Sequence, residues 1–377
     1  MTNARAITVT SLRGARVALV YGPGNLSVDF ASSLVRGIER AFLELGARVA
    51  TLNLASYRRS IETHVRRHGP DGPYPPNAPL LRGIIDFVRH TWADSPFDLC
   101  FGLFDDVFLS DELADVLRSR CHRVINYPLN LLDQPHRFAK ATKFCDETFC
   151  SEEEALAPLR ERYGAHKIRY VPMAADPFIH RPIARPERPR LLFVGSLYAD
   201  RVLLLERCAD IIDVSIYGPH YDAMTVIKMF AREFAHHRRV NDLWYAVRAL
   251  SRAVLRDQRV VSDEEFVRLA SEHGVSLGCS SVRQERTGKA LHKVRLRDYE
   301  STMCGLCHVA KRLPEIERSF LEGEEILLYE NDSELLDILA KVRDREVDWA
   351  AIGKRARARA ERDHTWTRRL GSAFGGE

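Results

Sequence analysis

Glu300 is an acidic residue inside a run that otherwise has the pattern of a buried helix start. The run, KVRLRDYESTMCG, extends from Lys293 to Gly305 and is followed by a short turn and an apolar segment. Because an ionised carboxylate makes short, strong hydrogen bonds, we expect Glu300 to hold a specific partner. Two local alternatives are that Glu300 caps its own helix or pairs with Arg297, one helical turn before it.

Other residues able to contact an anion stand where strands are expected to end. Gly195 and Ser196 close an apolar run, and the absence of a bulky side chain there would let a phosphate or a sugar approach the backbone. Arg201 follows at the expected start of the next helix, where its guanidinium could neutralise a negative charge. The alternatives are an ordinary strand-to-helix turn and a solvated surface arginine.

Acidic residues occupy comparable positions in the N-terminal half. Asp105, Asp106 and Asp133 lie at predicted strand ends, where a carboxylate could act as a base or contact an acceptor. Aspartate is also common in turns and at helix caps, so each residue could have only that local function. Asp106 and Asp133 are our candidate catalytic residues.

The cysteines indicate neither a metal site nor a disulfide framework. Most of the eight cysteines lie within apolar segments, which is typical of reduced thiols in a core. Cys304 and Cys307 form a Cys-x-x-Cys pair, but no second pair and no histidine at zinc-ligand spacing accompanies them. We therefore expect core packing for this pair, no bound metal and no cofactor.

The composition predicts a two-domain protein without a strongly charged partner. The chain has 377 residues, of which 45% are hydrophobic, more than one ordinary core usually organises. A net charge of +4 is too small for a protein whose main partner is bulk nucleic acid, although a local anionic ligand stays open. No signal peptide and no membrane-spanning run is evident, so we expect a cytoplasmic protein.

Short apolar runs alternate with helical patterns, which is typical of parallel sheets flanked by helices. A linker with five prolines over 171–190 separates two such patterns. We predict an N-terminal Rossmann-like domain over 1–170, a C-terminal one over 191–360 and a closing helix over 361–377. Predicted strands cover 16–22, 47–54, 97–104, 123–129, 147–151, 191–198, 213–219, 274–281, 306–313 and 325–331.

A mostly helical insert interrupts the second domain over 219–259. It combines apolar residues at helical spacing with many arginines and histidines. A packed helical hairpin with a solvated basic face would explain this pattern. The alternative is an element that contacts an anionic or lipid-linked acceptor, or a membrane surface.

From about Phe144 onward the chain resembles the CgeB-like, or spore-maturation-protein-like, branch of the GT-B glycosyltransferases. The resemblance rests on four stretches in the family's order and approximate spacing, of which the third is the most specific. It covers a little over half of the chain, and the N-terminal domain matches only in its general pattern of strands. The stretches are VPMAADP, FVGSLYADR, RLRDYESTMCG with its downstream EIERSFLEGEEILLYENDSELL, and RDHTWTRRL.

This resemblance implies a nucleotide-diphosphate-sugar donor in the C-terminal domain and an acceptor in the N-terminal domain, facing each other across a cleft. It places Glu300 where the family has a carboxylate that accepts hydrogen bonds from ribose hydroxyls. The residues after it would begin a helix or turn whose backbone N–H groups point toward the diphosphate. The donor-site residues expected from the resemblance are Gly195, Ser196, Arg201, Arg297, Glu300, Ser301 and Gly305.

One departure from the family pattern concerns the reaction centre. Many retaining GT-B enzymes have a second glutamate eight positions before the ribose-binding one, and His292 stands there in this chain. The stereochemistry of transfer therefore stays open. We predict a metal-independent glycosyltransferase with an unidentified acceptor, and the alternatives are a GT-B sugar-nucleotide epimerase and a catalytically silent nucleotide-sugar-binding protein.

Overall fold

The computed structural model describes most of the chain and divides it into two units. The described residues are 12–21, 28–53, 67, 79–92, 96–106, 109–184, 186–196, 199–218, 227, 244–245, 247–248 and 261–375. The N-terminal unit consists of Met1–Ala174, Ser281–Lys293 and Trp366–Glu377, and the C-terminal unit of Ala175–Ser280 and Val294–Thr365. The predicted continuous domains over 1–170 and 191–360 are therefore corrected: two later segments belong to the first unit.

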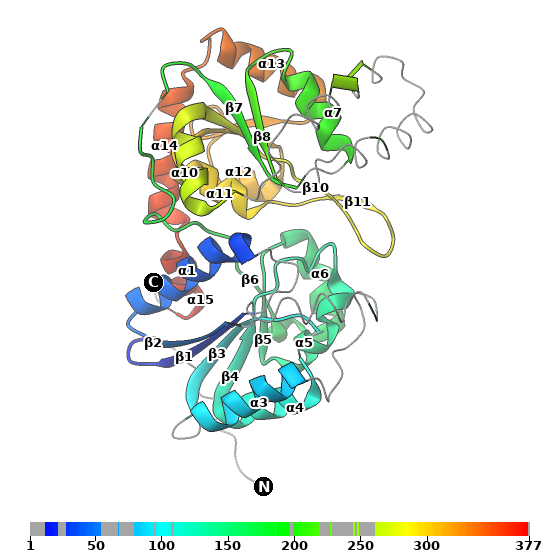
Figure 1. The fold of residues 1–377 in the computed structure, drawn as a ribbon, viewed down its shortest axis with the longest axis vertical. Helices are drawn as coiled ribbons and strands as arrows, with labels where there is room; N and C mark the ends of the chain where they lie inside the picture. Colours follow the sequence, from blue (N-terminus) through cyan, green and yellow to red (C-terminus); the bar gives the residue numbers. More distant parts are fainter. Residues whose placement is uncertain are drawn as a thin grey trace. The chain divides into compact units, whose positions relative to one another are not determined.

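The N-terminal unit is built on a parallel six-stranded sheet with the order β2-β1-β3-β4-β5-β6 (Figure 1). Its strands are β1 Arg16–Tyr21, β2 Arg48–Asn53, β3 Phe97–Leu103, β4 Cys121–Asn126, β5 Glu147–Cys150 and β6 Ile168–Tyr170. Its helices are α1 Val28–Glu44, α3 Pro79–Thr91, α4 Asp111–Arg120, α5 Ala139–Phe144, α6 Glu153–Tyr163 and α15 Trp366–Ala373. Two short 3₁₀ turns, Pro135–Phe138 and Ala165–Lys167, and the antiparallel pair β10 Ser281–Arg283 and β11 Ala290–His292 complete it.

Alternation along the strands gives this sheet two separately packed faces. Ala18, Val20 and Cys100 belong to a core that includes apolar residues of α3 and α4. On the other face the aromatic rings of Phe101 and Phe149 are packed together, with ring centroids 5.8 Å apart. The following aromatic contacts extend this cluster to α1 and to the C-terminal segment: Phe42–Phe101, Phe42–Phe374, Phe149–Phe374 and Tyr127–Trp366.

The C-terminal unit has a parallel five-stranded sheet with the order β13-β12-β9-β7-β8. Leu191 and Phe193 share a core with residues of α7 (Ala199–Cys208), α13 (Asp332–Arg343) and α14 (Trp349–Asp363). Leu192 between them packs on the other face with residues of α10 (Asp263–His273). The strands are β7 Arg190–Val194, β8 Val214–Tyr217, β9 Gly274–Leu277, β12 Cys307–Lys311 and β13 Leu327–Tyr329. The helices are α7 Ala199–Cys208, α10 Asp263–His273, α11 Leu296–Met303, α12 Pro314–Ser319, α13 Asp332–Arg343 and α14 Trp349–Asp363.

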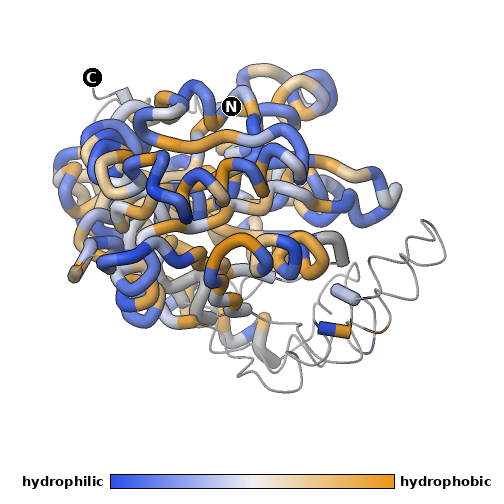
Figure 2. The backbone as a smooth tube through the Cα atoms, turned by 90° about the horizontal axis from the view of Figure 1, so that it is seen from above, coloured by the Kyte–Doolittle hydropathy of each residue, from blue (hydrophilic) through white to orange (hydrophobic). Residues whose placement is uncertain are grey.

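Figure 2 shows helical turns that alternate between hydrophilic and hydrophobic residues, as expected for helices with one buried face. Each predicted strand overlaps an observed strand, whereas β6 and the β10–β11 pair were not predicted. Most of the predicted insert over 219–259 lies outside the described residues. Within the described part of the chain, no helix combines the length and the apolar character needed to cross a membrane.

Candidate donor site

The strand order of the C-terminal unit reverses between β7 and β9. β7 pairs with β8, the next strand along the chain, on one side and with β9 on the other. The carboxyl ends of β7 and β9 are therefore neighbours at a topological switch point, where ligands of open α/β sheets bind. The residues that follow these ends are Gly195 and Ser196 after β7 and Gly278 to Ser280 after β9.

Arg201 joins the two strand ends. Its Nη1–H donates to the Ser196 carbonyl at 2.8 Å, and its Nη2–H donates to the Cys279 carbonyl at 3.2 Å. Only 6% of the residue is exposed, so the alternative of a solvated surface arginine is wrong. Arg201 instead links the loops after β7 and β9. Its contact with a diphosphate stays a prediction.

The backbone of Gly195 is packed against Gly218, the residue that follows β8. The Gly195 N–H donates to the Tyr217 carbonyl at 3.0 Å. A Cβ atom on Gly218 would lie 2.0 Å from the Gly195 carbonyl oxygen, and the φ of Gly218 is +145°. Gly218 is therefore required for this strand end, a requirement that the sequence analysis missed. The predicted donor contacts of Gly195 and Ser196 stay predictions.

Glu300 is buried in the second turn of α11 beside two basic side chains. Its Oε2 lies 3.0 Å from Arg297 Nη1, and its Oε1 lies 3.4 Å from His180 Nε2. The Arg297 guanidinium also stacks on the Phe266 ring, 3.9 Å from the ring centroid. The pairing with Arg297 that the sequence allowed is thus present, while ribose binding by Glu300 stays a prediction. His180 and Phe266 were missed because they are distant in sequence.

The helix expected to begin at Ser301 begins earlier, at Leu296, and ends at Met303. The Leu306 N–H donates to the Ser301 carbonyl, and the Gly305 N–H donates to the Thr302 carbonyl. With a φ of +76° at Gly305, these bonds form a Schellman cap at the carboxyl end of α11. The prediction that N–H groups of Ser301 to Gly305 face a diphosphate is therefore wrong, because the amino end of α11 lies at Leu296.

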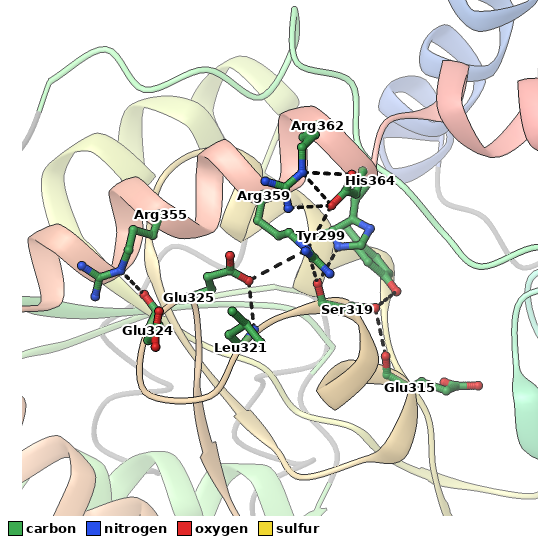
Figure 3. A network of polar contacts seen from close by, with 11 residues as sticks. Tyr299, Glu315, Ser319, Leu321, Glu324, Glu325, Arg355, Arg359, Arg362 and His364 are labelled. Atoms are coloured by element: carbon green, nitrogen blue, oxygen red, sulfur yellow. Dashed lines mark hydrogen bonds and ion pairs between the residues drawn. The ribbon is translucent and has the colours of Figure 1, made fainter. Parts of the chain in front are cut away.

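The neighbour of Glu300 in the chain, Tyr299, anchors α11 to Ser319 and His364 (Figure 3). Its hydroxyl lies 3.2 Å from Ser319 Oγ, and its ring packs against His364 with centroids 5.4 Å apart. The Ser319 carbonyl lies 2.7 Å from His364 Nε2 and accepts a hydrogen bond from Arg359 Nε at 3.1 Å. The helix that carries Glu300 is therefore also fixed by the contacts of Tyr299.

Asp106, a predicted catalytic residue of the N-terminal unit, is a helix cap. Its Oδ2 accepts a hydrogen bond from the Lys140 N–H at 2.9 Å, and its Oδ1 accepts one from the Ala141 N–H at 2.8 Å. Burial raises the pKa of the Asp106 carboxyl, against the opposing effect of these N–H donors. Both oxygens are used at the start of α5, so the capping alternative is present, while the catalytic role of Asp106 stays a prediction.

Asp133, the second predicted catalytic residue, belongs to a buried charge cluster in the N-terminal unit. Lys293 Nζ lies 2.6 Å from Asp133 Oδ1, 3.2 Å from Glu152 Oε1 and 3.0 Å from Asn130 Oδ1. Burial raises the pKa of the Glu152 carboxyl, and the Lys293 ammonium opposes that rise. Asp133 thus anchors Lys293, and its catalytic role stays a prediction.

The thiols of Cys304 and Cys307 are free and buried, as expected for core residues. Burial raises the pKa of Cys304 and raises that of Cys307 to about 12, so neither thiol readily becomes the thiolate that redox or metal chemistry requires. Among the residues that the structure describes, no group of three or more His, Cys, Asp or Glu side chains is arranged to hold a metal ion.

Residues 201–374, most of the C-terminal unit together with α15, match the family model described as glycosyl transferase-like. The match covers a little under half of the chain, and the chain as a whole has a GT-B fold. The Thermosynechococcus elongatus sucrose-phosphate synthase has a TM-score of 0.59 and 14% identity, with 96% of this chain and 98% of that chain covered. The Anabaena protein HepE, solved with UDP and glucose, has a TM-score of 0.57 and 13% identity, with 95% and 98% covered.

A glycosyltransferase from Rickettsia africae is a third similar structure, with a TM-score of 0.59, 11% identity and coverage of 96% of this chain and 97% of that chain. At these identities the likeness establishes the fold. No curated protein matches the chain. The structural likeness confirms the fold prediction. The family model begins at Arg201 and includes Arg297 and Glu300, and it bears out the coarse prediction of a glycosyltransferase for residues 201–374.

Proposed function

We propose that this glycosyltransferase transfers a sugar from a nucleoside-diphosphate sugar, and that the donor binds at the switch point of the C-terminal unit. The observation that carries the proposal is the clamp by which Arg201 holds the Ser196 and Cys279 carbonyls together at the ends of β7 and β9. Arg297 and Glu300 on α11 provide a cation and a carboxylate. A switch point with these groups suits an anionic diphosphate joined to a ribose.

We further propose that Arg297 changes partner when the donor binds. In the structure its guanidinium pairs with Glu300 at 3.0 Å, and the Glu300 side chain is only 2% exposed. A ribose can reach this carboxylate only if Arg297 moves aside or shares it. A diphosphate offers Arg297 a stronger, bidentate anionic partner, which would leave the Glu300 oxygens for the ribose hydroxyls.

The experiment compares UDP with deoxy-UDP in the parent protein, Glu300→Gln and Glu300→Ala. UDP is the first probe because HepE was solved with UDP and with UDP-glucose. Two charge-assisted bonds contribute about 1.5–3 kcal/mol each before desolvation, so Glu300→Ala should weaken UDP binding by about 2–4 kcal/mol, on the order of 30- to 1000-fold. The UDP affinity of Glu300→Gln should lie between those of the parent and Glu300→Ala, because a neutral amide oxygen accepts a weaker hydrogen bond than a carboxylate.

The parent should prefer UDP to deoxy-UDP, and Glu300→Ala should lose that preference, which isothermal titration measures as a double-mutant cycle. Glu272→Ala is the matched control, because Glu272 pairs with Arg268 within a helix of the same unit but is exposed. An equal ribose preference in folded parent and folded Glu300→Ala would remove Glu300 from the donor site. A thermal-shift screen of UDP, GDP, TDP and CDP first identifies the base.

We propose that transfer needs no metal ion, because arginine side chains and the amino end of α11 supply positive charge to the leaving diphosphate. Activity should therefore survive EDTA. Transfer or donor hydrolysis is assayed with and without the chelator, and complete loss that manganese or magnesium restores would contradict the proposal.

The finer assignment to the CgeB-like branch stays part of this proposal and is supported by the RLRDYESTMCG stretch. A lipid-linked acceptor or a peripheral membrane contact is likewise proposed from the basic residues of the sequence over 219–259. Replacement of Arg232, Arg238 and Arg239 by alanine should raise the acceptor KM and leave nucleotide binding as it was. Unchanged acceptor kinetics in the folded variant would contradict an acceptor contact.

A further inference from the structure

Three buried polar side chains join α11 to the sheet of the C-terminal unit. Ser276 Oγ on β9 lies 2.8 Å from His308 Nδ1 on β12, and His308 Nε2 lies 2.8 Å from Asp298 Oδ1 on α11. Ser276 is 3% exposed, His308 0% and Asp298 5%. Apolar side chains usually fill the layer between a helix and a sheet, so a polar chain at this place calls for an explanation.

The three residues are not a hydrolytic triad. In the Ser-His-Asp arrangement the serine contacts Nε2 and the carboxylate contacts Nδ1, and here the two ring nitrogens have the opposite partners. Burial of all three also keeps a substrate away from the serine hydroxyl. When Nε2–H of a neutral imidazole donates to the Asp298 carboxylate, Nδ1 is left to accept from the Ser276 hydroxyl.

The end of β9 lies directly against this chain of bonds. His308 and Ser276 are paired in the β9–β12 register, and Gly278, two residues after Ser276, faces the same side. A Cβ atom on Gly278 would lie 2.4 Å from Asp298 Oδ1 and 2.7 Å from His308 Nε2. The loop after β9 therefore lies so close to the Asp298–His308 bond that only glycine fits at position 278 without displacing these side chains.

Further bonds fix the same loop. The Gly278 N–H donates to the Val309 carbonyl at 2.8 Å, and Arg201 donates to the Cys279 carbonyl at 3.2 Å. The other oxygen of Asp298, Oδ2, accepts from the Arg295 N–H at 2.7 Å and so caps α11. One carboxylate thus joins the start of the helix to the switch point, two residues before Glu300.

Directional bonds do what apolar contact cannot. Apolar packing between a helix and a sheet is non-directional, so it tolerates small shifts of the helix along its axis. Hydrogen bonds weaken steeply when their geometry departs from linearity, so the two bonds of His308 hold α11 at one depth and one rotation. We propose that Ser276, His308 and Asp298 are positioning residues that place the first turns of α11, and with them Glu300, for the donor nucleotide. This inference rests on the donor site proposed above.

The experiment measures UDP, GDP, TDP and CDP affinity by calorimetry in the parent, His308→Ala and Ser276→Ala. His273→Ala is the matched control. His273 is also a buried histidine, and its Nδ1 lies 2.6 Å from the Leu269 carbonyl oxygen. It precedes β9, however, and so lies at the amino end of that strand, away from the switch point. Hydrogen exchange of the α11 amides is followed in the same proteins.

His308→Ala should weaken binding of the nucleotide that the parent prefers by roughly 10- to 100-fold, as loss of outer-sphere support or a displacement of about 1 Å does elsewhere. The α11 amides should exchange faster. Even with a similar loss of stability, His273→Ala should keep the nucleotide affinity and the α11 exchange of the parent. Asp298→Asn should lose less affinity than Asp298→Ala, because an amide can still cap Arg295 and donate to Nε2 after the imidazole changes tautomer.

Folded His308→Ala with parent-like affinity and parent-like α11 exchange would overturn the inference. If His308→Ala does not fold, Ser276→Ala decides, since it removes one bond and keeps the ring; parent-like affinity and exchange there would also overturn it. A parent that binds none of the four nucleotides defeats the proposed donor site itself, and in that case the exchange data alone tell whether the three residues hold α11.

Discussion

Replacing Lys293 by methionine tests the buried charge cluster of the N-terminal unit. The side chains of Lys293 and Glu152 are each 2% exposed, and that of Asp133 is 10% exposed. Methionine keeps most of the lysine volume and removes the ammonium, leaving two carboxylates without their shared cation. Breaking a buried ion pair on one side costs about 3–5 kcal/mol, which for a unit of this size lowers Tm by on the order of 10 °C.

The loss should depend on pH through Glu152. Burial holds its folded pKa above the ordinary value of 4.5, so the stability linked to its proton is complete below the unfolded pKa and is lost as pH rises through the folded pKa. Without Lys293, which opposes the rise, the folded pKa should increase further. Lys293→Met should therefore cost less at pH 5 than at pH 8, because a protonated Glu152 needs no cation.

Calorimetric unfolding at both pH values measures these effects. Lys289→Met is the matched control, because Lys289 is exposed on the same hairpin segment. Adding Glu152→Gln to Lys293→Met should recover part of the lost stability at pH 8, since one buried charge disappears. A Tm for Lys293→Met within about 2 °C of that for Lys289→Met, or a loss that is the same at both pH values, would refute this account.

Two further variants test single residues. Gly218→Ala should cost more than about 3 kcal/mol, because its Cβ would lie 2.0 Å from a backbone oxygen. Gly288→Ala is the comparison, since Gly288 has a φ of +68° and open space around it, and it should cost about 1–2 kcal/mol. Equal Tm values for the two variants would contradict the packing of β7 against β8. Asp106→Ala should cost about 1–2 kcal/mol through the lost cap of α5 and leave kcat near that of the parent. A 100-fold lower kcat at an unchanged Tm would instead support the catalytic prediction.

Much of the fold was predictable because its signals are local. Strands and helices are specified by residues close together in the chain, through the alternation of apolar runs with amphipathic segments. This pattern predicted the parallel sheets of both units. The position of Glu300 near the start of a helix was predicted for the same reason. The error at Ser301 to Gly305 is also local: Gly305 ends α11 in a Schellman cap, and the sequence was read there as a beginning.

The sequence alone determined the two Rossmann-like patterns, the glycosyltransferase resemblance and the place of Arg297 and Glu300 on one helix face. Only the tertiary structure decided which segments belong together, because contacts between residues far apart in the chain leave no periodic signal. Trp366 and Phe374 pack against aromatic rings of the N-terminal unit, and Lys293 forms a buried ion pair with Asp133 of that unit. The bonds from Ser276 through His308 to Asp298 likewise depend on the β9–β12 register, which no local pattern encodes.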